Sequence, residues 1–191
     1  MVEKVDTGPC GKAICLKRYN FFKELKIYVS SLFMDNCYAF PVVYTDGLVS
    51  YLYKDSEGRT PYGIEIYDQI ILLNDADKKM TVTNAREYCK NIHFAGFVGS
   101  CPSIDALWFI SKKFSKINHL IKKLGGTPFK KGLYCSSNKV YYTKDGCISY
   151  ETNPKAKCGY LALDIQAEDT PPVRPIDLDK TFVYVRPALK L

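Results

Sequence analysis

The feature that most limits the fold of this 191-residue chain is a long stretch in its middle with the apolar periodicity of a helix. Apolar side chains recur there at intervals of three and four, which buries one stripe of an amphipathic helix. Ser103 can cap the first turn, Asp105 suits the positive end of the helix dipole, and Gly125 ends the pattern. We therefore predict one helix from Ser103 to Leu124. Its apolar positions are Ile104, Leu107, Trp108, Ile110, Phe114, Ile117, Ile121 and Leu124.

Short β-like segments flank this helix on both sides. Residues 39–73 hold two or three of them, separated by an Asp-Gly turn signal at 46–47 and by a polar loop. A shorter helix is predicted from Thr83 to about Ile92, and further short strands follow Gly132. This order of elements is typical of an α+β domain.

The N-terminal residues do not continue this pattern. Residues 1–38 are rich in aromatic and aliphatic side chains but fit neither a helical nor a strand period well. We therefore interpret 1–38 as an N-terminal extension that packs on the domain or on a neighbouring subunit, and 39–191 as the domain itself.

The positive charge of the chain is concentrated in one stretch. The net charge is +7, and nine lysines lie between residues 106 and 144 without a single acidic residue. One interpretation is an anionic partner such as nucleic acid or lipid. The other is a solvated helix face, which is favoured because Lys outnumbers Arg, the usual ligand of phosphate. The lysines that a nucleic-acid partner would contact are Lys112, Lys113, Lys116, Lys122, Lys123, Lys130 and Lys131.

The residues that usually carry catalysis are poorly placed. His93 and His119 are the only histidines, and neither has a carboxylate at the spacing of a catalytic triad. No G-x-S-x-G motif surrounds the Cys-Ser-Ser segment at 135–137. The eight cysteines include no C-x-x-C pair, so we expect most of them to be small buried thiols and expect no metal site. The sequence therefore predicts a protein that is not an enzyme and needs no cofactor.

The apolar segments also bear on location. None approaches the ~20 residues that span a bilayer, and the first residues lack the apolar stretch of a signal peptide. We expect no membrane span, and either a virion component or cytoplasmic synthesis with display at a surface.

One segment has the composition of a binding surface. Between Tyr134 and Tyr160, tyrosines alternate with Ser, Asn, Thr, Asp and Gly. Tyr supplies large contact area at low entropic cost, and small polar residues adapt their hydrogen bonds, as in antibody paratopes. Because Tyr also favours strands, an ordinary strand-rich region explains the same composition.

Five motifs follow one another from about Phe40 to Leu191. They are VVYTDGLVSYLYKDSEGRTPYGIEI, NAREYC, CPSIDALWFI, LYCSSN and VYVRPALKL. In this order they resemble bacterial and phage C-type-lectin-like domains related to the formylglycine-generating enzyme fold. That family includes the C-terminal domain of collagen-like adhesins and the variable proteins of diversity-generating retroelements. The resemblance implies an α+β fold with two helices packed on short antiparallel strands, and with long irregular C-terminal loops.

The chain departs from this family at three positions. Cys101 replaces a Leu, Ala106 replaces a Glu, and Cys135 replaces a Trp. The calcium-binding triplets of sugar-binding lectins are absent, and no copper-binding pair can be assigned to Cys147 and Cys158. Calcium-dependent sugar binding and formylglycine generation are therefore not expected.

The resemblance implies a non-enzymatic protein that recognises a receptor or another protein or cell-surface ligand through changeable C-terminal residues, as the retroelement variable proteins of phages and bacteria do. Homo-oligomers are an expected partner, because symmetric assembly gives avidity to weak sites. The alternative is the basic nucleic-acid-binding protein described above. Ser136, Ser137, Arg186 and Pro187 are expected to serve as scaffold. The expected ligand contacts are Asn138, Lys139, Tyr141, Tyr142, Tyr150, Asn153 and Tyr160.

Overall fold

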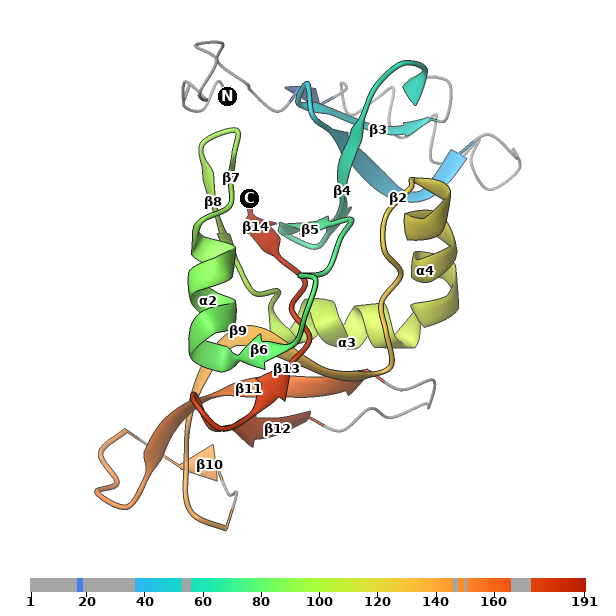
Figure 1. The fold of residues 1–191 in the computed structure, drawn as a ribbon. Helices are drawn as coiled ribbons and strands as arrows, with labels where there is room; N and C mark the ends of the chain where they lie inside the picture. Colours follow the sequence, from blue (N-terminus) through green and yellow to red (C-terminus); the bar gives the residue numbers. More distant parts are fainter. Residues whose placement is uncertain (1–16, 19–36, 53–55, 146–147, 150, 166–172) are drawn as a thin grey trace.

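The computed structural model describes residues 17–18, 37–52, 56–145, 148–149, 151–165 and 173–191. Strands make up 44% of the structure and helices 21%, so it is mostly β (Figure 1). The predicted two-helix α+β fold of C-type-lectin-like type is therefore wrong. Three features overturn it: a large sheet, long paired strands in place of irregular C-terminal loops, and a third helix in the described part of the chain.

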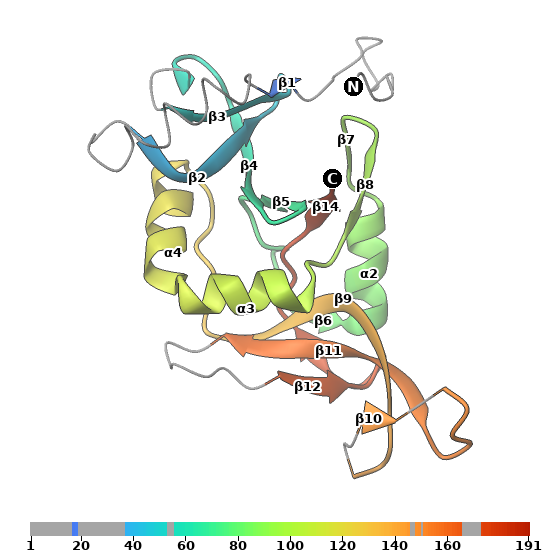
Figure 2. The same cartoon turned by 180° about the vertical axis from the view of Figure 1, so that it is seen from behind.

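The largest sheet contains eight strands. They are β1 (Lys17–Arg18), β2 (Cys37–Tyr44), β3 (Leu48–Leu52), β4 (Pro61–Ile66), β5 (Gln69–Leu72), β7 (His93–Phe94), β8 (Phe97–Ser100) and β14 (Ala188–Lys190). Their order across the sheet is β1-β3-β2-β4-β5-β14-β8-β7. Strand β1 pairs with β3 in parallel, and the other neighbours are antiparallel. The C-terminal strand β14 lies between β5 and β8, so the end of the chain joins two parts of the sheet (Figures 1 and 2).

Residues 39–73 lie in four strands rather than two or three. The predicted first turn is confirmed, because Gly47 has a φ of 84° and its N–H donates to the carbonyl of Tyr44 at 2.9 Å. The additional strand arises because residues 61–72 turn back at Tyr67, whose φ of 55° separates β4 from β5. Asp68 is a turn residue, but Tyr67 before it gives no signal of this turn, since such a φ is uncommon for a bulky side chain.

The C-terminal half contains a four-stranded sheet and a two-stranded one. The strands of the first are β9 (Gly132–Tyr142), β10 (Ile148–Ser149), β11 (Lys157–Ile165) and β12 (Val173–Ile176). They are ordered β10-β9-β11-β12 and all pair antiparallel. The second joins β6 (Met80–Thr81) to β13 (Phe182–Val183). Strands β9 and β11 are the longest in the described part, because each satisfies the backbone hydrogen bonds of the other along most of its length.

Two helices replace the predicted helix over 103–124. They are α3 (Ile104–Lys112) and α4 (Phe114–Lys123). Ser103 caps α3 as predicted, since its Oγ accepts a hydrogen bond from a first-turn backbone N–H at 3.2 Å. The break lies at Lys113, whose φ of −111° and ψ of 23° are not helical, and α4 then runs in a different direction (Figures 1 and 2). The apolar period continues through the break because both helices bury one face against the same core.

The shorter predicted helix is α2 (Val82–Lys90), whose start differs from the prediction by one residue. Its cap is Thr81 rather than Thr83: the Thr81 side chain accepts from a first-turn N–H at 3.5 Å. The Thr83 hydroxyl instead donates to Asp179 at 2.7 Å and ties α2 to the segment before β13.

Of the three apolar clusters in the described part of the chain, two pack helices against the sheets, and the third joins strands of the large sheet. The larger packs α3 and α4 against the large sheet and one end of β9 and β11. The smaller lies between α2, β9, β11 and the C-terminal segment, and it includes three cysteines. Burial at about 25 cal/mol per Å² of apolar surface makes clusters of this kind the main source of stability. Fully buried members of the first cluster include Ile64, Ile71, Leu107, Ile117, Ile121, Tyr134 and Leu163.

Candidate ligand-binding face

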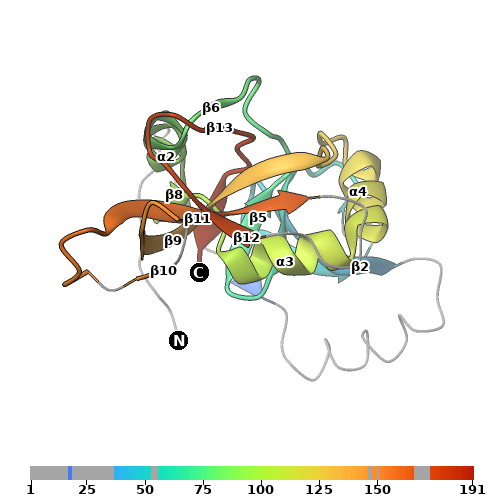
Figure 3. The same ribbon diagram turned by 90° about the horizontal axis from the view of Figure 1, so that it is seen from below.

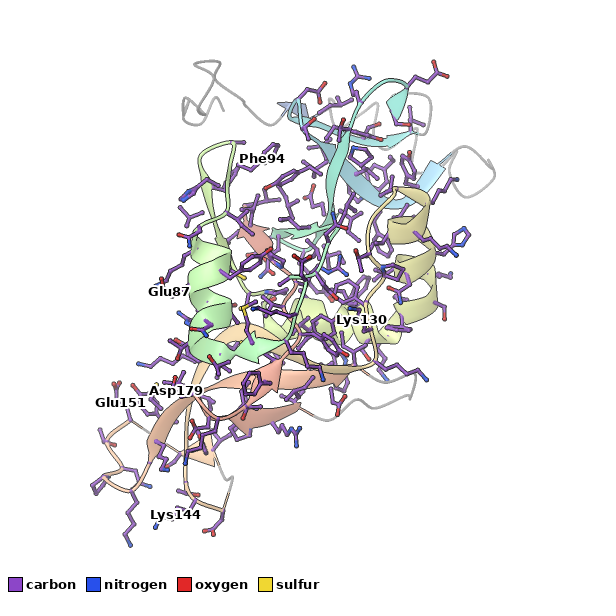
Figure 4. All side chains as sticks on the ribbon, in the orientation of Figure 1. Glu87, Phe94, Lys130, Lys144, Glu151 and Asp179 are labelled. Carbon is purple, nitrogen blue, oxygen red and sulfur yellow. The ribbon has the colours of Figure 1, made fainter. Side chains whose placement is uncertain are left out.

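The distal halves of β9 and β11, together with β10, extend beyond the helices (Figures 1, 2 and 3). We call this projecting part the arm and define it as residues 138–145, 148–149 and 151–160. Figure 4 places Lys144 and Glu151 in it, away from the body of the molecule. Its strands are held by pairing of Tyr142 with Ile148 on one side and with Lys157 on the other.

The register of the arm decides which side chains share a face. Tyr141 lies opposite Cys158 in β11 and opposite Ser149 in β10, and Lys139 lies opposite Tyr160. Directly opposed residues of antiparallel strands project to the same side, and so do residues two apart in one strand. These five residues therefore form one surface, which we call the Tyr141 face.

Two side chains of the Tyr141 face, Lys139 and Tyr141, are linked to each other and to the neighbouring Glu151. The ammonium of Lys139 donates to the hydroxyl of Tyr141 at 2.8 Å and lies 4.9 Å from the centre of its ring. The Tyr141 hydroxyl in turn donates to Oε1 of Glu151. The pKa of Lys139 is raised, chiefly by this hydrogen bond to Tyr141. This chain of contacts orders the exposed side chains of Lys139 and Glu151 and the half-buried side chain of Tyr141.

Tyr160 connects the Tyr141 face to a helix. The guanidinium of Arg86 in α2 lies over the Tyr160 ring, 4.0 Å from its centre. Both residues are partly exposed. A cation–π contact of this kind contributes about 0.5–2 kcal/mol, depending on how far it is desolvated. Arg86 therefore adds a positive group at the edge of the Tyr141 face, which the sequence analysis missed because Arg86 is 74 positions before Tyr160.

The structure places the other predicted contact residues differently. The Oδ1 of Asn138 accepts the backbone N–H of Ile104 at 2.7 Å, so Asn138 supports the start of α3. The side chain of Asn153 accepts from the N–H of Lys155 at 3.0 Å and donates to the Ser149 hydroxyl at 2.8 Å, which stabilises the turn before β11.

Tyr142 belongs to the opposite side of the arm, because it is adjacent to Tyr141 in an extended strand. Its ring lies against Gly159, where an added Cβ would be 2.6 Å from Cε1 of Tyr142. Tyr150 lies outside the described residues. Of the seven predicted contact residues, the structure thus brings Lys139, Tyr141 and Tyr160 together on one face.

The predicted scaffold residues lie inside the fold. The buried hydroxyl of Ser136 donates to the carbonyl of Leu161 at 2.7 Å, at the irregularity between Tyr160 and Ala162. The N–H of Ser137 donates to the carbonyl of Pro102 at 2.8 Å. These contacts connect β9 to its neighbours where the arm leaves the body.

Arg186 occupies a buried polar network that also includes Asp75, which the sequence analysis did not single out. Its Nε lies 2.6 Å from Oδ1 of Asp75, and the Tyr134 hydroxyl donates to Oδ2 of that carboxylate at 2.8 Å. The guanidinium also donates to the carbonyls of Leu72 and Thr127. Burial raises the pKa of Asp75, and the charge of Arg186 opposes this shift. We interpret the network as a structural anchor, because it is closed to solvent.

Pro187 follows Arg186 and is also buried. Its carbonyl accepts the N–H of Leu72 at 3.0 Å, next to the strand pair of β5 and β14.

The lysines of the alternative prediction are exposed on α3, on α4 and in the loop that follows. The Nζ of Lys112 lies 5.3 Å from the centre of the Trp108 ring, and that of Lys130 lies 5.5 Å from the centre of the Tyr184 ring. Since α3 and α4 run in different directions (Figure 1), these lysines do not follow one helix face.

The described residues contain no group of three or more His, Cys, Asp or Glu side chains that could hold a metal ion. In the same part of the chain, no helix is long and apolar enough to cross a membrane. No family model, no curated protein and no solved structure matches the chain.

Proposed function

We propose that this protein is a non-enzymatic binding protein that recognises a protein ligand at the Tyr141 face. The observation that carries the proposal is the linked set of Lys139, Tyr141 and Glu151 on an arm that projects from the body. Aromatic and charged side chains that are already ordered lose less conformational entropy on binding than free ones.

The charge of the arm indicates which kind of partner surface it favours. Residues 138–160 contain four lysines and two acidic residues, and Arg86 adds another positive group beside Tyr160. A partner with an acidic or neutral surface is favoured over a basic one, because like charges at an interface cost affinity. The face is small for a stable interface of about 800 Å² per partner. Self-association that presents several arms together supports useful avidity, so we keep a homo-oligomer as part of the proposal.

The first experiment identifies the partner by site-specific photo-crosslinking. A benzoylphenylalanine is placed at Cys158, which is exposed and lies opposite Tyr141 on the Tyr141 face, and in a control at Tyr67, which is 60% exposed in the turn between β4 and β5. We expect one partner to be crosslinked from position 158 and not from position 67. Crosslinking of the same partner from both positions contradicts the assignment to the arm.

The second experiment measures the affinity of that purified partner for three variants. Tyr141→Ala and Tyr160→Ala should each weaken binding about tenfold or more, since aromatic residues dominate interface energies. Tyr67→Ala is the matched control and should bind as the parent does. If both arm variants retain the parent affinity, the Tyr141 face is not the binding site.

Diversification by a retroelement stays a prediction with its own test. The flanking DNA would contain a near-copy of the codons from Tyr134 to Leu191, differing mainly at adenines, beside a reverse-transcriptase gene. If the differing codons include those of Lys139, Tyr141 and Tyr160, the contact surface and the diversified surface coincide. Without such a copy, the proposal is an invariant binding protein.

Nucleic-acid binding through the lysines of residues 112–131 also stays a prediction. Titration of random duplex DNA at several salt concentrations tests it. A steep loss of affinity with rising salt supports it, because phosphate contacts release counterions. Absence of binding at low salt excludes it.

A further inference from the structure

Three buried thiols meet where α2 packs against β8 and β9. They are Cys89 from α2, Cys101 from the segment before α3, and Cys135 from β9. The sulfurs of Cys89 and Cys101 are 3.9 Å apart, and Cys101 also interacts with the thiol of Cys135. The Cys135 thiol has an additional acceptor in the carbonyl of Ser136, at 3.3 Å. This cluster is separate from the exposed thiol of Cys158 in the arm.

The backbones that carry Cys89 and Cys101 are in close contact. A Cβ added at Gly99 would lie 2.1 Å from the carbonyl oxygen of Cys89, so the end of α2 touches β8 two residues before Cys101. The hydrogen bond from the N–H of Gly99 to the carbonyl of Ile92, at 2.7 Å, holds this approach. A disulfide needs its sulfurs at about 2.05 Å. The sulfurs of Cys89 and Cys101 are 3.9 Å apart, so they would have to move about 1.9 Å closer to form this bond.

The contacts within the cluster distinguish the two thiols. Cys101 contacts both of the others, and hydrogen bonds from Cys135 and then Cys89 hold the pKa of Cys101 below its ordinary value. The pKa of Cys89 is raised, first by its hydrogen bond to Cys101 and then by burial. The positive charge of Arg86, one turn before Cys89 in α2, favours the thiolate form of either thiol. Because Cys101 is the member that both neighbours contact, we assign it as the nucleophile and Cys89 as the thiol that keeps its proton.

We propose that Cys89 and Cys101 form a dithiol that hydrogen peroxide or another small hydroperoxide converts to an intramolecular disulfide. The Cys101 thiolate attacks one peroxide oxygen, the O–O bond breaks, and a sulfenic acid forms as hydroxide leaves. The Cys89 sulfur then attacks the Cys101 sulfur, the S–O bond breaks, and water leaves as Cys89 gives up its proton. In sum, two thiols and one hydrogen peroxide give one disulfide and two waters.

The burial of both sulfurs limits which oxidants can reach them, and their positions determine which elements the disulfide would join. A small neutral peroxide reaches them more readily than a bulky disulfide such as oxidised glutathione. The bond would tie α2 to the segment between β8 and α3. Because α2 also carries Arg86, oxidation would immobilise the helix that contacts Tyr160 in the arm.

The test uses the full chain, reduced and then treated with hydrogen peroxide. After alkylation of the remaining thiols and digestion without reductant, mass spectrometry should find a peptide pair joined through Cys89 and Cys101. Dithiothreitol should reverse it. A pair joined through Cys101 and Cys135 instead, or no joined pair involving Cys101, overturns the proposal.

Variants assign the two roles. Cys89→Ser should prevent the disulfide and leave a sulfenic acid at Cys101 that dimedone traps, whereas Cys158→Ser should form the disulfide as the parent does. Arg86→Gln should slow the reaction several-fold, because less thiolate is present. Peptide mapping of the parent decides the pairing even if a cluster variant fails to fold. Dimedone labelling at Cys89 rather than Cys101 in single-cysteine variants contradicts the assigned order of attack.

Discussion

At the level of single residues, the contact between Asp75 and Arg186 shows why spacing in the sequence does not predict which buried side chains pair. Their side chains are almost fully buried and form an ion pair, yet 111 positions separate them. Arg186 was singled out as scaffold from the C-terminal motif, whereas Asp75 stands in a polar run after β5 that looks like a solvated turn. A buried charge needs a partner, but only the fold shows which one.

Replacing Asp75 by Asn should destabilise the protein by about 3–5 kcal/mol, because Arg186 would be left as a buried charge without a counterion. Urea unfolding monitored by circular dichroism measures the loss. Asp46→Asn is the matched control: its partner Arg59 lies at 2.9 Å but both are exposed, and the loss should be below about 1 kcal/mol. Equal losses in the two variants would contradict the role given to Asp75.

The hydroxyl of Tyr141 can be removed without removing its ring. In Tyr141→Phe the pKa of Lys139 should fall toward its ordinary value, because the hydrogen bond to Tyr141 is the main cause of its rise. An NMR titration of the Lys139 side chain measures this change. If the pKa of Lys139 stays raised, the contact between the two side chains is not formed in solution.

At the scale of elements, the strands and helices depend on contacts between neighbours as much as on local propensity. Asn138 in β9 supplies the acceptor for the backbone N–H of Ile104 at the start of α3, a contact that spans 34 positions. Its residue type predicts a ligand contact, because Asn is common in binding surfaces. Its location beside the first turn of α3 gives Asn138 a structural role as an acceptor for a free backbone N–H.

Asn138→Ala should lower stability by about 1 kcal/mol, as loss of a helix cap does. Asn138→Asp keeps an oxygen acceptor beside the positive end of α3 and should retain most of that stability. Thermal unfolding of the parent and both variants makes the comparison. An alanine variant as stable as the parent, with weakened ligand binding, would restore Asn138 as a contact residue.

The close packing around Gly159 leads to a second prediction, about how β11 lies against β12. A Cβ at this position would lie 2.5 Å from the carbonyl oxygen of Ile176 and 2.6 Å from the ring of Tyr142. Gly159→Ala should therefore cost about 1–3 kcal/mol through overpacking.

In the matched control Gly58→Ala, an added Cβ has no atom within 4 Å, and only the φ of +72° opposes it. Its loss should be about 1 kcal/mol, as expected for strain alone. Chemical denaturation of both variants gives the difference, and a Gly159→Ala loss no larger than the control contradicts the close packing of β11 on β12.

At the scale of the whole molecule, the C-terminal strand completes the large sheet. Strand β14 pairs with β5 on one side and β8 on the other, and its residues Ala188 and Leu189 are fully buried. Deleting residues 188–191 should abolish cooperative unfolding, because it exposes two strand edges and opens the core. Lys190→Ala, at an exposed position of the same strand, should unfold like the parent. A cooperative transition of the truncated chain in calorimetry would show that β5 and β8 do not need β14.

Local interactions could be predicted from the order of residues alone. The Asp-Gly turn at 46–47, the Ser103 cap, the approximate span of α2 and the burial of Cys89 follow from residues within a few positions of one another. Hydrogen bonds inside a turn or at a helix start use only neighbouring groups, so the pattern of residue types is enough to predict them.

Four features emerge only in the folded molecule: the large share of strands, the break at Lys113, the position of β14, and the division of the predicted contact residues between the Tyr141 face and the scaffold. Each of these features depends on which distant segment supplies the partner for a backbone or side-chain group. An apolar run can pair with several possible partners, and the choice is made by packing of the whole core, which no local pattern contains.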